Sequence, residues 1–357
     1  MKILRKIIVL IQVILIIFAL TSTNQINTFA SSKINVNNRK IANIAVLLHS
    51  FEDLYLLEVK QSLEDIQKEN SDKVKFTFYD GKNNIVIQNA TINSLLKSNV
   101  DLFILDLVDV RESIIKDVIS DIQPKNVPIM FMEVPPDVVS KVSKYYDKDV
   151  FLYSTSSGEG NLQGKILVDA WNSNKNTIDR NHDDILQYIL LKGEPTSPYT
   201  IERSKDALLA LNNAGIKTEE LAQVNANWFK ELAKDAINNL FLGYDGKIEA
   251  IIANNDAMAI GAIESLQKYG YNTGDKNKTI AVVGIDGLKE AKDLIDKGYM
   301  TGTLIQDTRM VSEAFYNIAM NLINNKNPIN NTNYTLKEGS IVIPESYTEY
   351  TNKANTP

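Results

Sequence analysis

The sequence predicts an α/β fold of two Rossmann-like lobes, each built on a parallel β-sheet. Apolar segments of strand length alternate with amphipathic segments of helix length along nearly the whole chain. The apolar segments are almost continuous, as is typical of strands that helices cover on both faces. The alternation starts again near residue 160, so two similar halves with a cleft between them are expected.

The first half opens with residues 41–48 (IANIAVLL), an apolar run of strand length. Residues 54–66 are expected to form a helix, because Leu57, Leu63 and Ile66 fall on one stripe. Further strands are predicted at 74–79, 102–108 and 127–134, and further helices at 86–97 and 111–122. This βαβαβαβ order is typical of a parallel sheet with helices on both faces.

The second half repeats this order. Helices are predicted at 160–171, 201–214, 230–239, 256–269, 288–297 and 308–325. Strands are predicted at 186–191, 223–226, 248–253, 280–285, 303–306 and 339–344. Ligands of open α/β sheets bind beyond the carboxyl ends of the strands, so the residues that follow each strand are the candidates for a site.

The composition excludes several classes of function. The chain of 357 residues is long enough for two domains, and its net charge of −6 argues against nucleic acid as a partner. It contains no cysteine, which excludes disulfides, thiolate metal sites and cysteine nucleophiles. With only His49 and His182, the chain has few residues for a zinc site or a histidine-based triad. His49 is expected to have a solvated or loop role rather than to contact a ligand. Ser197 has no obvious base near it, so no enzyme activity is expected.

Residues 1–30 have the pattern of an export signal. Three basic residues precede an apolar run of 14 residues at 7–20, and Thr28-Phe29-Ala30 resembles a cleavage site. As a helix this run would reach roughly 21 Å, short of the ~30 Å hydrocarbon core of a bilayer. A flexible leader is expected at 31–40. The mature protein is thus expected outside the cytoplasmic membrane, without a lipid anchor because no cysteine follows; an uncleaved membrane anchor is the alternative.

Polar side chains follow several of the predicted strands, among them Asp53, Asp106, Asn255 and Asp286. Carboxylates and amides at such places suit the paired hydroxyl groups of an uncharged polyol. Aromatic rings such as that of Trp228 could cover the apolar faces of a sugar. The alternative for any one of these residues is that it caps the helix that follows.

Three stretches of the mature chain resemble a known family: IIANNDAMAIGAIESL (251–266), VVGIDGLKEA (282–291) and LLKGEP (190–195). They are similar to segments of the galactose/glucose-binding proteins of bacterial sugar ABC transport, of the type I periplasmic-binding-protein family. The resemblance extends from about Ile41 to Tyr350. It implies two lobes joined by a three-strand hinge, with crossings near 132–133, 305–306 and 336–338. The N-terminal lobe would comprise 41–132 plus 307–336, and the C-terminal lobe 133–306 plus 337–357.

The same resemblance implies ten sugar-binding positions. Two rings would stack on the two faces of the sugar, and the polar residues would bind its hydroxyl groups. The ten positions are Asp53, Tyr55, Asp106, Ser197, Tyr199, Arg203, Trp228, Asn255, Asp286 and Gln306.

Four of these positions depart from the family pattern. Asp106 and Gln306 stand where the family has asparagine, and both remain polar. Ser197 and Tyr199 stand in place of a histidine and an aspartate that contact the sugar ring and its anomeric end. The change removes a strong acceptor and adds bulk, so a preference for glucose is not assumed.

A second group of residues points to calcium. Residues 179–187 place oxygen donors at alternate positions, as in the first part of an EF-hand loop. The resemblance implies that a distant glutamate closes the site. The ligands would be Asp179, Asn181, Asp183, the carbonyl of Ile185, Gln187 and Glu249. Asp184 stands where such loops use glycine for a positive φ, which aspartate tolerates better than most residues. A polar surface turn is the alternative.

The resemblance implies an extracytoplasmic, monomeric sugar-binding protein that delivers a galactose- or glucose-like monosaccharide to a membrane ABC permease and carries structural Ca²⁺. A sugar sensor that presents its ligand to a membrane histidine kinase or chemoreceptor is the first alternative, and an enzyme on this fold is the second. A DNA-binding repressor is disfavoured, because an export signal occupies the place of a helix-turn-helix.

Overall fold

The computed structural model describes residues 40–154, 158–244, 246–344 and 346–352. The predicted export signal and all of the leader except Lys40 lie outside the described residues. From Ile41 onward the chain forms one compact unit with two β-sheets. Among the described residues, none of the helices combines the length and the apolar character that a membrane span requires.

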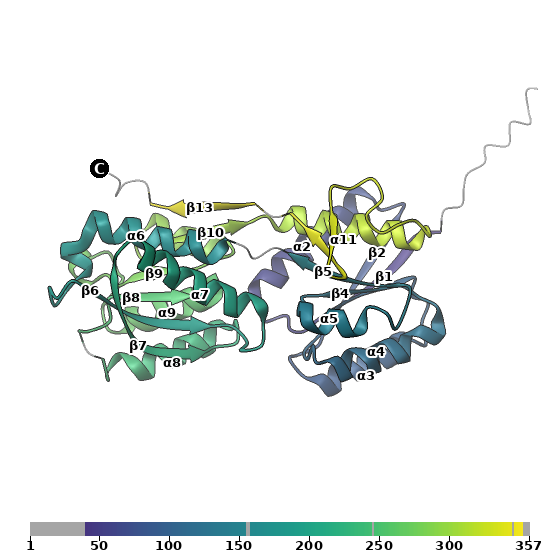
Figure 1. The fold of residues 1–357 in the computed structure, drawn as a ribbon, viewed down its shortest axis with the longest axis horizontal. Helices are drawn as coiled ribbons and strands as arrows, with labels where there is room; N and C mark the ends of the chain where they lie inside the picture. The colour runs from purple at the N-terminus through teal and green to yellow at the C-terminus, as the bar shows by residue number, and fades with distance from the viewer. Residues whose placement is uncertain (1–39, 155–157, 245, 345, 353–357) are drawn as a thin grey trace, which may run out of the picture. The chain divides into compact units, whose positions relative to one another are not determined.

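The first lobe contains a seven-stranded sheet with the order β11-β12-β5-β4-β3-β1-β2 (Figure 1). Its neighbouring strands are parallel except for the antiparallel pair β11 and β12. The strands are β1 (Ala42–Leu48), β2 (Val74–Asp80), β3 (Leu102–Asp106), β4 (Ile129–Met132), β5 (Asp149–Ser154), β11 (Thr335–Lys337) and β12 (Ser340–Ile343).

Helices cover both faces of this sheet, as the continuous apolar strands predict. Ile44 and Val46 of β1 pack with α2 (Leu54–Glu69) and α11 (Thr308–Ile323). Ala45 and Leu47 point to the opposite face. The helices on that face are α3 (Ile85–Leu95), α4 (Glu112–Ile122) and α5 (Pro136–Val142), and the short 3₁₀ helix η1 (Gln123–Lys125) follows α4.

The second lobe contains a six-stranded sheet with the order β13-β10-β9-β8-β6-β7. All its neighbouring strands are parallel except β10 and β13. The strands are β6 (Ile185–Lys192), β7 (Lys217–Asn225), β8 (Ala250–Ala253), β9 (Ala281–Val283), β10 (Gly302–Gln306) and β13 (Tyr347–Thr351).

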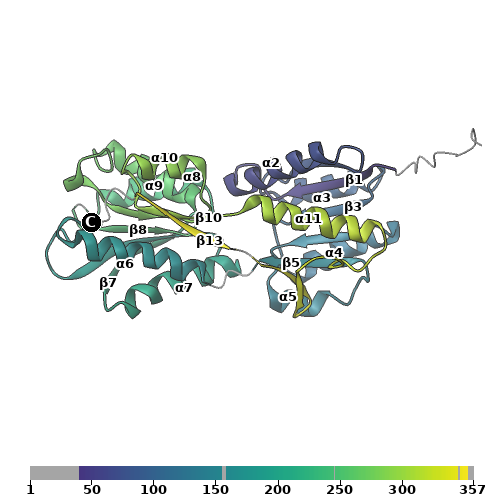
Figure 2. The ribbon, with the colours of Figure 1, turned by 90° about the horizontal axis from the view of Figure 1, so that it is seen from above.

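This sheet is also covered on both faces. One face packs on α6 (Glu159–Ile178) and α7 (Pro198–Asn213), and Trp171 lies in that core. Figure 2 shows these two helices running along one side of the lobe. The opposite face packs on α8 (Lys230–Phe241), α9 (Asp256–Lys268) and α10 (Lys289–Asp296), and the 3₁₀ helix η2 (Lys276–Lys278) precedes β9. The prediction of two α/β lobes with mostly parallel sheets is confirmed.

Two of the predicted lobe boundaries are wrong. Strand β5 pairs with β4 in the first lobe, so the first crossing follows Ser154 and not Met132. Strand β12 pairs with β5, so the third crossing lies between Ile343 and Tyr347. The second crossing, between β10 and α11, lies where it was predicted.

The physical reason is that the missed segments lack the pattern used to find strands. Strand β5 (DVFLYS) begins with Asp149 and is too short to show a periodicity. Strand β13 is an edge strand whose residues are mostly exposed. Helix α5 and strand β11 are also short and were not predicted either.

Candidate functional site

The main cavity is lined by residues that follow the carboxyl ends of strands in both sheets. It contains about 470 Å³ of empty space, part of it open to solvent. The lining residues are His49, Asp53, Tyr55, Leu56 and Glu133 from the first lobe and Tyr199, Arg203, Trp228, Asn255, Asp286 and Gln306 from the second. Eight of the ten predicted positions are among them; Asp106 and Ser197 are not.

Asp53 and Asn255 are helix caps and also line the cavity. The Asp53 Oδ1 accepts a hydrogen bond of 3.0 Å from the Leu56 N–H at the start of α2. The Asn255 Oδ1 accepts one of 3.0 Å from the Met258 N–H at the start of α9. The capping and binding interpretations therefore do not exclude one another, because a cap fixes the side chain at the cavity wall.

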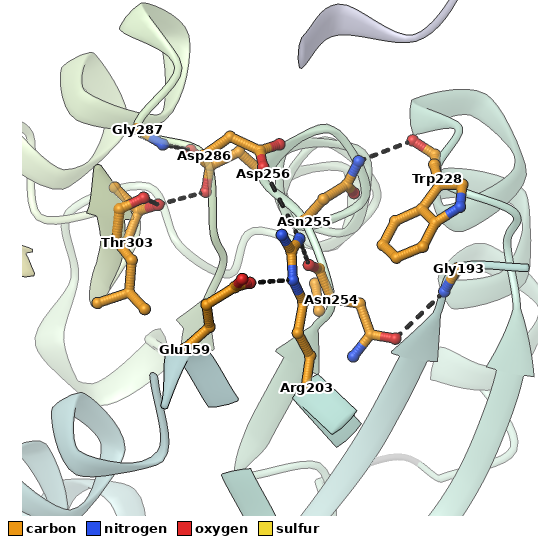
Figure 3. A network of polar contacts seen from close by, with 12 residues as sticks. Glu159, Gly193, Arg203, Trp228, Asn254, Asn255, Asp256, Asp286, Gly287 and Thr303 are labelled. Atoms are coloured by element: carbon orange, nitrogen blue, oxygen red, sulfur yellow. Dashed lines mark hydrogen bonds and ion pairs between the residues drawn. The ribbon is translucent and has the colours of Figure 1, made fainter. Parts of the chain in front are cut away.

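Arg203 lies at the centre of a buried network on the second-lobe side (Figure 3). It is 5% exposed, and its Nε donates to the carboxylate of Glu159, which is fully buried. Its Nη1 donates to the Asn254 carbonyl oxygen at 2.9 Å and lies 3.9 Å from the Asp286 Oδ1. Although burial lowers its pKa, Glu159 and Asp286 raise it by more, so the guanidinium keeps its charge.

Trp228 packs directly on the backbone of Gly193. A Cβ atom at Gly193 would lie 2.1 Å from the Cζ2 atom of the indole ring, so only glycine fits there. The Gly193 N–H donates to the Asn254 Oδ1 at 3.2 Å, and the Asn255 Nδ2 donates to the Trp228 carbonyl oxygen at 3.1 Å. Trp228 has a φ of +72°. Its backbone is held by the hydrogen bond from Asn255, and its ring is held by the contact with Gly193.

Asp286 presents an acceptor without a donor. Its side chain is 3% exposed, and among the described residues its Oδ2 has no hydrogen-bond partner. Burial raises its pKa well above the ordinary value; Arg203 opposes this shift, and Asp256 and Asp53 reinforce it. A buried acceptor of this kind is expected to bind a donor from a ligand.

The neighbouring Asp256 has a structural role. Its carboxylate accepts hydrogen bonds from the Gly287 N–H at 2.8 Å, the Leu288 N–H at 2.9 Å and the Thr303 hydroxyl at 2.7 Å. These bonds hold the turn that carries Asp286, whose own φ is +128°. The side chain of Asp256 therefore positions Asp286 and does not line the cavity.

On the first-lobe side, His49 faces the cavity and Asp106 lies behind it. The His49 Nδ1 is 2.7 Å from the Asp106 Oδ2, which also accepts from the His49 N–H at 3.0 Å. Burial lowers the pKa of His49, but Asp106 and other nearby carboxylates raise it by more, to about 10. The expectation of a solvated His49 is wrong, and Asp106 acts on the cavity through the charged imidazole.

Glu133 also lines the cavity and was not predicted. It directly follows β4 and has a φ of +55°. Water reaches its side chain, but desolvation by the surrounding protein, followed by the carboxylates of Asp106 and Asp53, raises its pKa, opposed by His49. His49 is the first residue after the predicted strand 41–48, so the strand-end rule applied there would have found it. Glu133 lay inside the predicted strand 127–134, and only the observed end of β4 at Met132 places it at a strand end.

The departures at Ser197 and Tyr199 differ in position. Tyr199 is 4% exposed and lines the cavity, with the Arg203 guanidinium 5.5 Å from its ring centroid. Ser197 is the residue before α7 and lies outside the cavity lining. An adjoining cavity shares Tyr55, Glu133 and Tyr199 with the main one and is otherwise apolar, lined by Val59, Met132, Leu152, Val311, Phe315 and Ile343.

The predicted calcium ligands lie on or beside one loop between α6 and β6. The Asp179 Oδ1 accepts from the Asp183 N–H at 3.1 Å, and the Asp183 Oδ2 accepts from the Gln187 Nε2 at 2.8 Å. Glu249 accepts from the Arg180 N–H at 2.7 Å and from the Gln187 N–H at 3.1 Å.

Two observations bear on whether a cation fits this loop. The Gln187 Oε1 is buried without a hydrogen-bond partner among the described residues, and Asp184 adopts the predicted positive φ, +64°. In the described part of the chain, however, no three Asp, Glu or His side chains gather in a metal-binding arrangement. The donor types fit Ca²⁺, and the ion stays a prediction.

Comparisons with known proteins agree on one family. A family model described as a periplasmic binding protein domain matches residues 44–327. The D-galactose/methyl-galactoside binding periplasmic protein MglB of Haemophilus influenzae is 29% identical over 316 residues, 88% of this chain and 90% of that protein. The ribose import binding protein RbsB of Bacillus subtilis is 20% identical over 292 residues, 82% of this chain and 85% of that protein.

Solved structures share the fold. An ABC transporter periplasmic solute binding protein from Actinobacillus succinogenes with bound D-allose has a TM-score of 0.68 at 19% identity, covering 88% of this chain and 99% of its own. A solute binding protein from Bacillus halodurans with bound myo-inositol has a TM-score of 0.67 at 20% identity, covering 88% of this chain and 96% of its own.

Proposed function

The chain belongs to the periplasmic binding protein family, and we propose that its cavity binds a monosaccharide or similar polyol outside the cytoplasmic membrane. The observation that carries this proposal is the convergence of Asp53, Arg203, Asn255 and Asp286, with Trp228, on one cavity. Carboxylate oxygens accept from hydroxyl groups, the guanidinium donates to them, and the amide does both. The indole ring covers the apolar C–H face of a sugar.

The ligand class is supported by the relatives. The similar protein of Haemophilus influenzae is named for D-galactose and methyl-galactoside, and the neighbouring structures hold D-allose and myo-inositol. A galactose- or glucose-like ligand that is delivered to an ABC permease is the proposal these names favour. A ligand that contacts both lobes would stabilise the conformation in which both reach it.

Ligand binding is testable with a panel of hexoses, pentoses and inositols. A binding sugar is expected to change the tryptophan fluorescence and to raise the melting temperature through linkage. Asp286→Asn should weaken binding at least tenfold, because it replaces one of the two carboxylate oxygens in the cavity with an amide donor. Asp121→Asn, at an exposed aspartate on α4, is the matched control. A wild-type protein that responds to no member of the panel at millimolar concentration would overturn the proposal.

We also propose that Ca²⁺ binds the 179–187 loop and stabilises the second lobe. The donors Asp179, Asp183, Gln187 and Glu249 would hold it through oxygen. Calcium at a hundred times its Kd is expected to add about 2.7 kcal/mol to the free energy of unfolding. Melting curves in chelator and in Ca²⁺, for wild type and Asp183→Asn, measure this. Superimposed wild-type curves would remove the calcium proposal and leave the sugar proposal intact.

A further inference from the structure

The cavity lining contains more acidic than basic groups. Three carboxylates line it, those of Asp53, Glu133 and Asp286, whereas its two cationic residues are His49 and Arg203. A ligand without charge would leave this imbalance as it is, because hydroxyl groups supply hydrogen bonds and no counter-charge.

Both cations are already engaged with carboxylates that do not line the cavity. The His49 Nδ1 is 2.7 Å from Asp106, and the Arg203 Nε donates to Glu159. Neither Asp106 nor Glu159 is among the lining residues. The positive charge that faces the cavity is therefore largely neutralised from behind. The pKa of each of the three lining acids is raised, chiefly by desolvation, so a bound cation would favour their ionised form.

Of these three carboxylates, Asp286 has one long ion pair, with Arg203, and Glu133 has none with a described residue. The nearest guanidinium nitrogen to Asp286 is 3.9 Å from its Oδ1, and its Oδ2 has no hydrogen-bond partner among the described residues although the side chain is 3% exposed. Glu133 makes no ion pair with any described residue. A cationic donor would satisfy the buried Asp286 oxygen and would offset the local charge, whereas a hydroxyl group would do only the first.

We propose that the ligand of this cavity is an aminated polyol, an amino sugar or aminocyclitol with a protonated amine that is bound by the lining carboxylates. This inference rests on the proposed function, since it names the ligand class of the same site. The polar network on the second-lobe side would bind the hydroxyl groups, and Glu133, with Asp286 or Asp53, would bind the ammonium group. The flat rings that line the cavity add cation–π attraction.

Calorimetric titration of matched ligand pairs tests this proposal. Each pair has the same ring and differs only by an amine in place of one hydroxyl: D-galactose with D-galactosamine, D-glucose with its 2-, 3- and 6-amino derivatives, and myo-inositol with amino-inositols. At pH 7, at least one amine is expected to bind about tenfold or more tightly than its hydroxyl parent. Its N-acetyl derivative, which has no charge, should lose this advantage.

The variant Glu133→Gln sharpens the test, because it removes the charge and keeps the shape of the side chain. It is expected to reduce the ratio of amine affinity to parent affinity by about tenfold. The control Asp121→Asn should leave that ratio unchanged. An unchanged ratio in Glu133→Gln would contradict the role of Glu133.

The wild-type titrations alone decide the proposal even if the variant does not fold. Parents that bind while no amine binds more tightly would overturn the inference and leave the proposed function standing. A protein that binds neither hydroxyl nor amino compounds would instead overturn the proposed function itself.

Discussion

The two sides of the cavity are built differently. On the second-lobe side, Arg203, Asn254 and Trp228 belong to one continuous buried network that includes Glu159 and Gly193 (Figure 3). This network fixes each side chain by at least one backbone or ion-pair contact before any ligand arrives.

On the first-lobe side, the charged groups stand at single strand ends. The His49 imidazole pairs with Asp106 and packs edge-on against the ring of Phe229, and Glu133 makes no ion pair with any described residue. This difference indicates that the second-lobe side is preorganised to bind hydroxyl groups. The first-lobe side sets the charge of the site and hence its selectivity.

The largest expected effect tests how much each side of the cavity contributes to the free energy of unfolding. Arg203→Met leaves the fully buried Glu159 carboxylate without its cation, which should cost about 3–5 kcal/mol of the free energy of unfolding. Glu133→Gln should leave that free energy unchanged or raise it slightly, because desolvation by the surrounding protein and the carboxylates of Asp106 and Asp53 disfavour the Glu133 charge. Urea denaturation of both variants measures the difference.

The double variant Arg203→Met with Glu159→Gln is the control for Arg203. It removes the buried charge on both partners and should recover part of the lost stability. Equal stability of Arg203→Met and wild type would contradict the view that the second-lobe network is tightly coupled.

The next effect concerns the ring that covers the ligand. Gly193→Ala forces a Cβ atom into the indole of Trp228, and the ring cannot bend away while its backbone is held by Asn255. The expected cost is about 3 kcal/mol, at the upper end for overpacking, together with altered tryptophan fluorescence.

Gly243→Ala is the matched control, because its Cβ would meet only the Leu240 carbonyl oxygen, at 3.4 Å. Thermal melts and emission spectra of both variants check the prediction. If the Gly193 and Gly243 variants behaved alike, the close packing of Trp228 would not be needed.

The smallest effect concerns pH on the first-lobe side. The pKa of His49 is about 10 in the folded protein and near the ordinary 6.5 when unfolded, so the protonated His49–Asp106 pair stabilises the fold. That contribution, about 2 kcal/mol for a charged hydrogen bond, is fully present below pH 6.5 and is lost as the pH rises to about 10.

Melting temperatures of wild type and His49→Gln from pH 6 to pH 10 measure this loss. The advantage of wild type over the variant should shrink across that range, since glutamine does not titrate. An advantage that stays constant would show that His49 is neutral in the folded protein.

Much of the fold could be predicted because periodicity is a local property. Strand β1 and helix α9 carry apolar patterns long enough to identify each element by itself. Strand β5 could not be found in this way, since its six residues owe their place to pairing with β4 and with β12, and β12 lies far away in sequence. Missing β5 then moved the first lobe boundary.

Site residues could be predicted where their type and their position at the end of a strand were enough to identify them. Asp53, Asn255 and Asp286 follow strands, and all three line the cavity. Asp106 also ends a strand, but its carboxylate bonds to His49 and lies behind it. No sequence rule shows that His49 faces the cavity and Asp106 lies behind it, because this arrangement depends on how β1 and β3 lie side by side in the sheet.

The amino-acid sequence by itself determined the two α/β lobes, the absence of thiol chemistry and most of the polar residues around the cavity, because these depend on composition and short-range pattern. Only the tertiary structure decided where the chain crosses between lobes, which of His49 and Asp106 faces the cavity, and that Glu133 joins them. These features arise from contacts between residues far apart in the chain, where burial and neighbouring charges set both position and protonation.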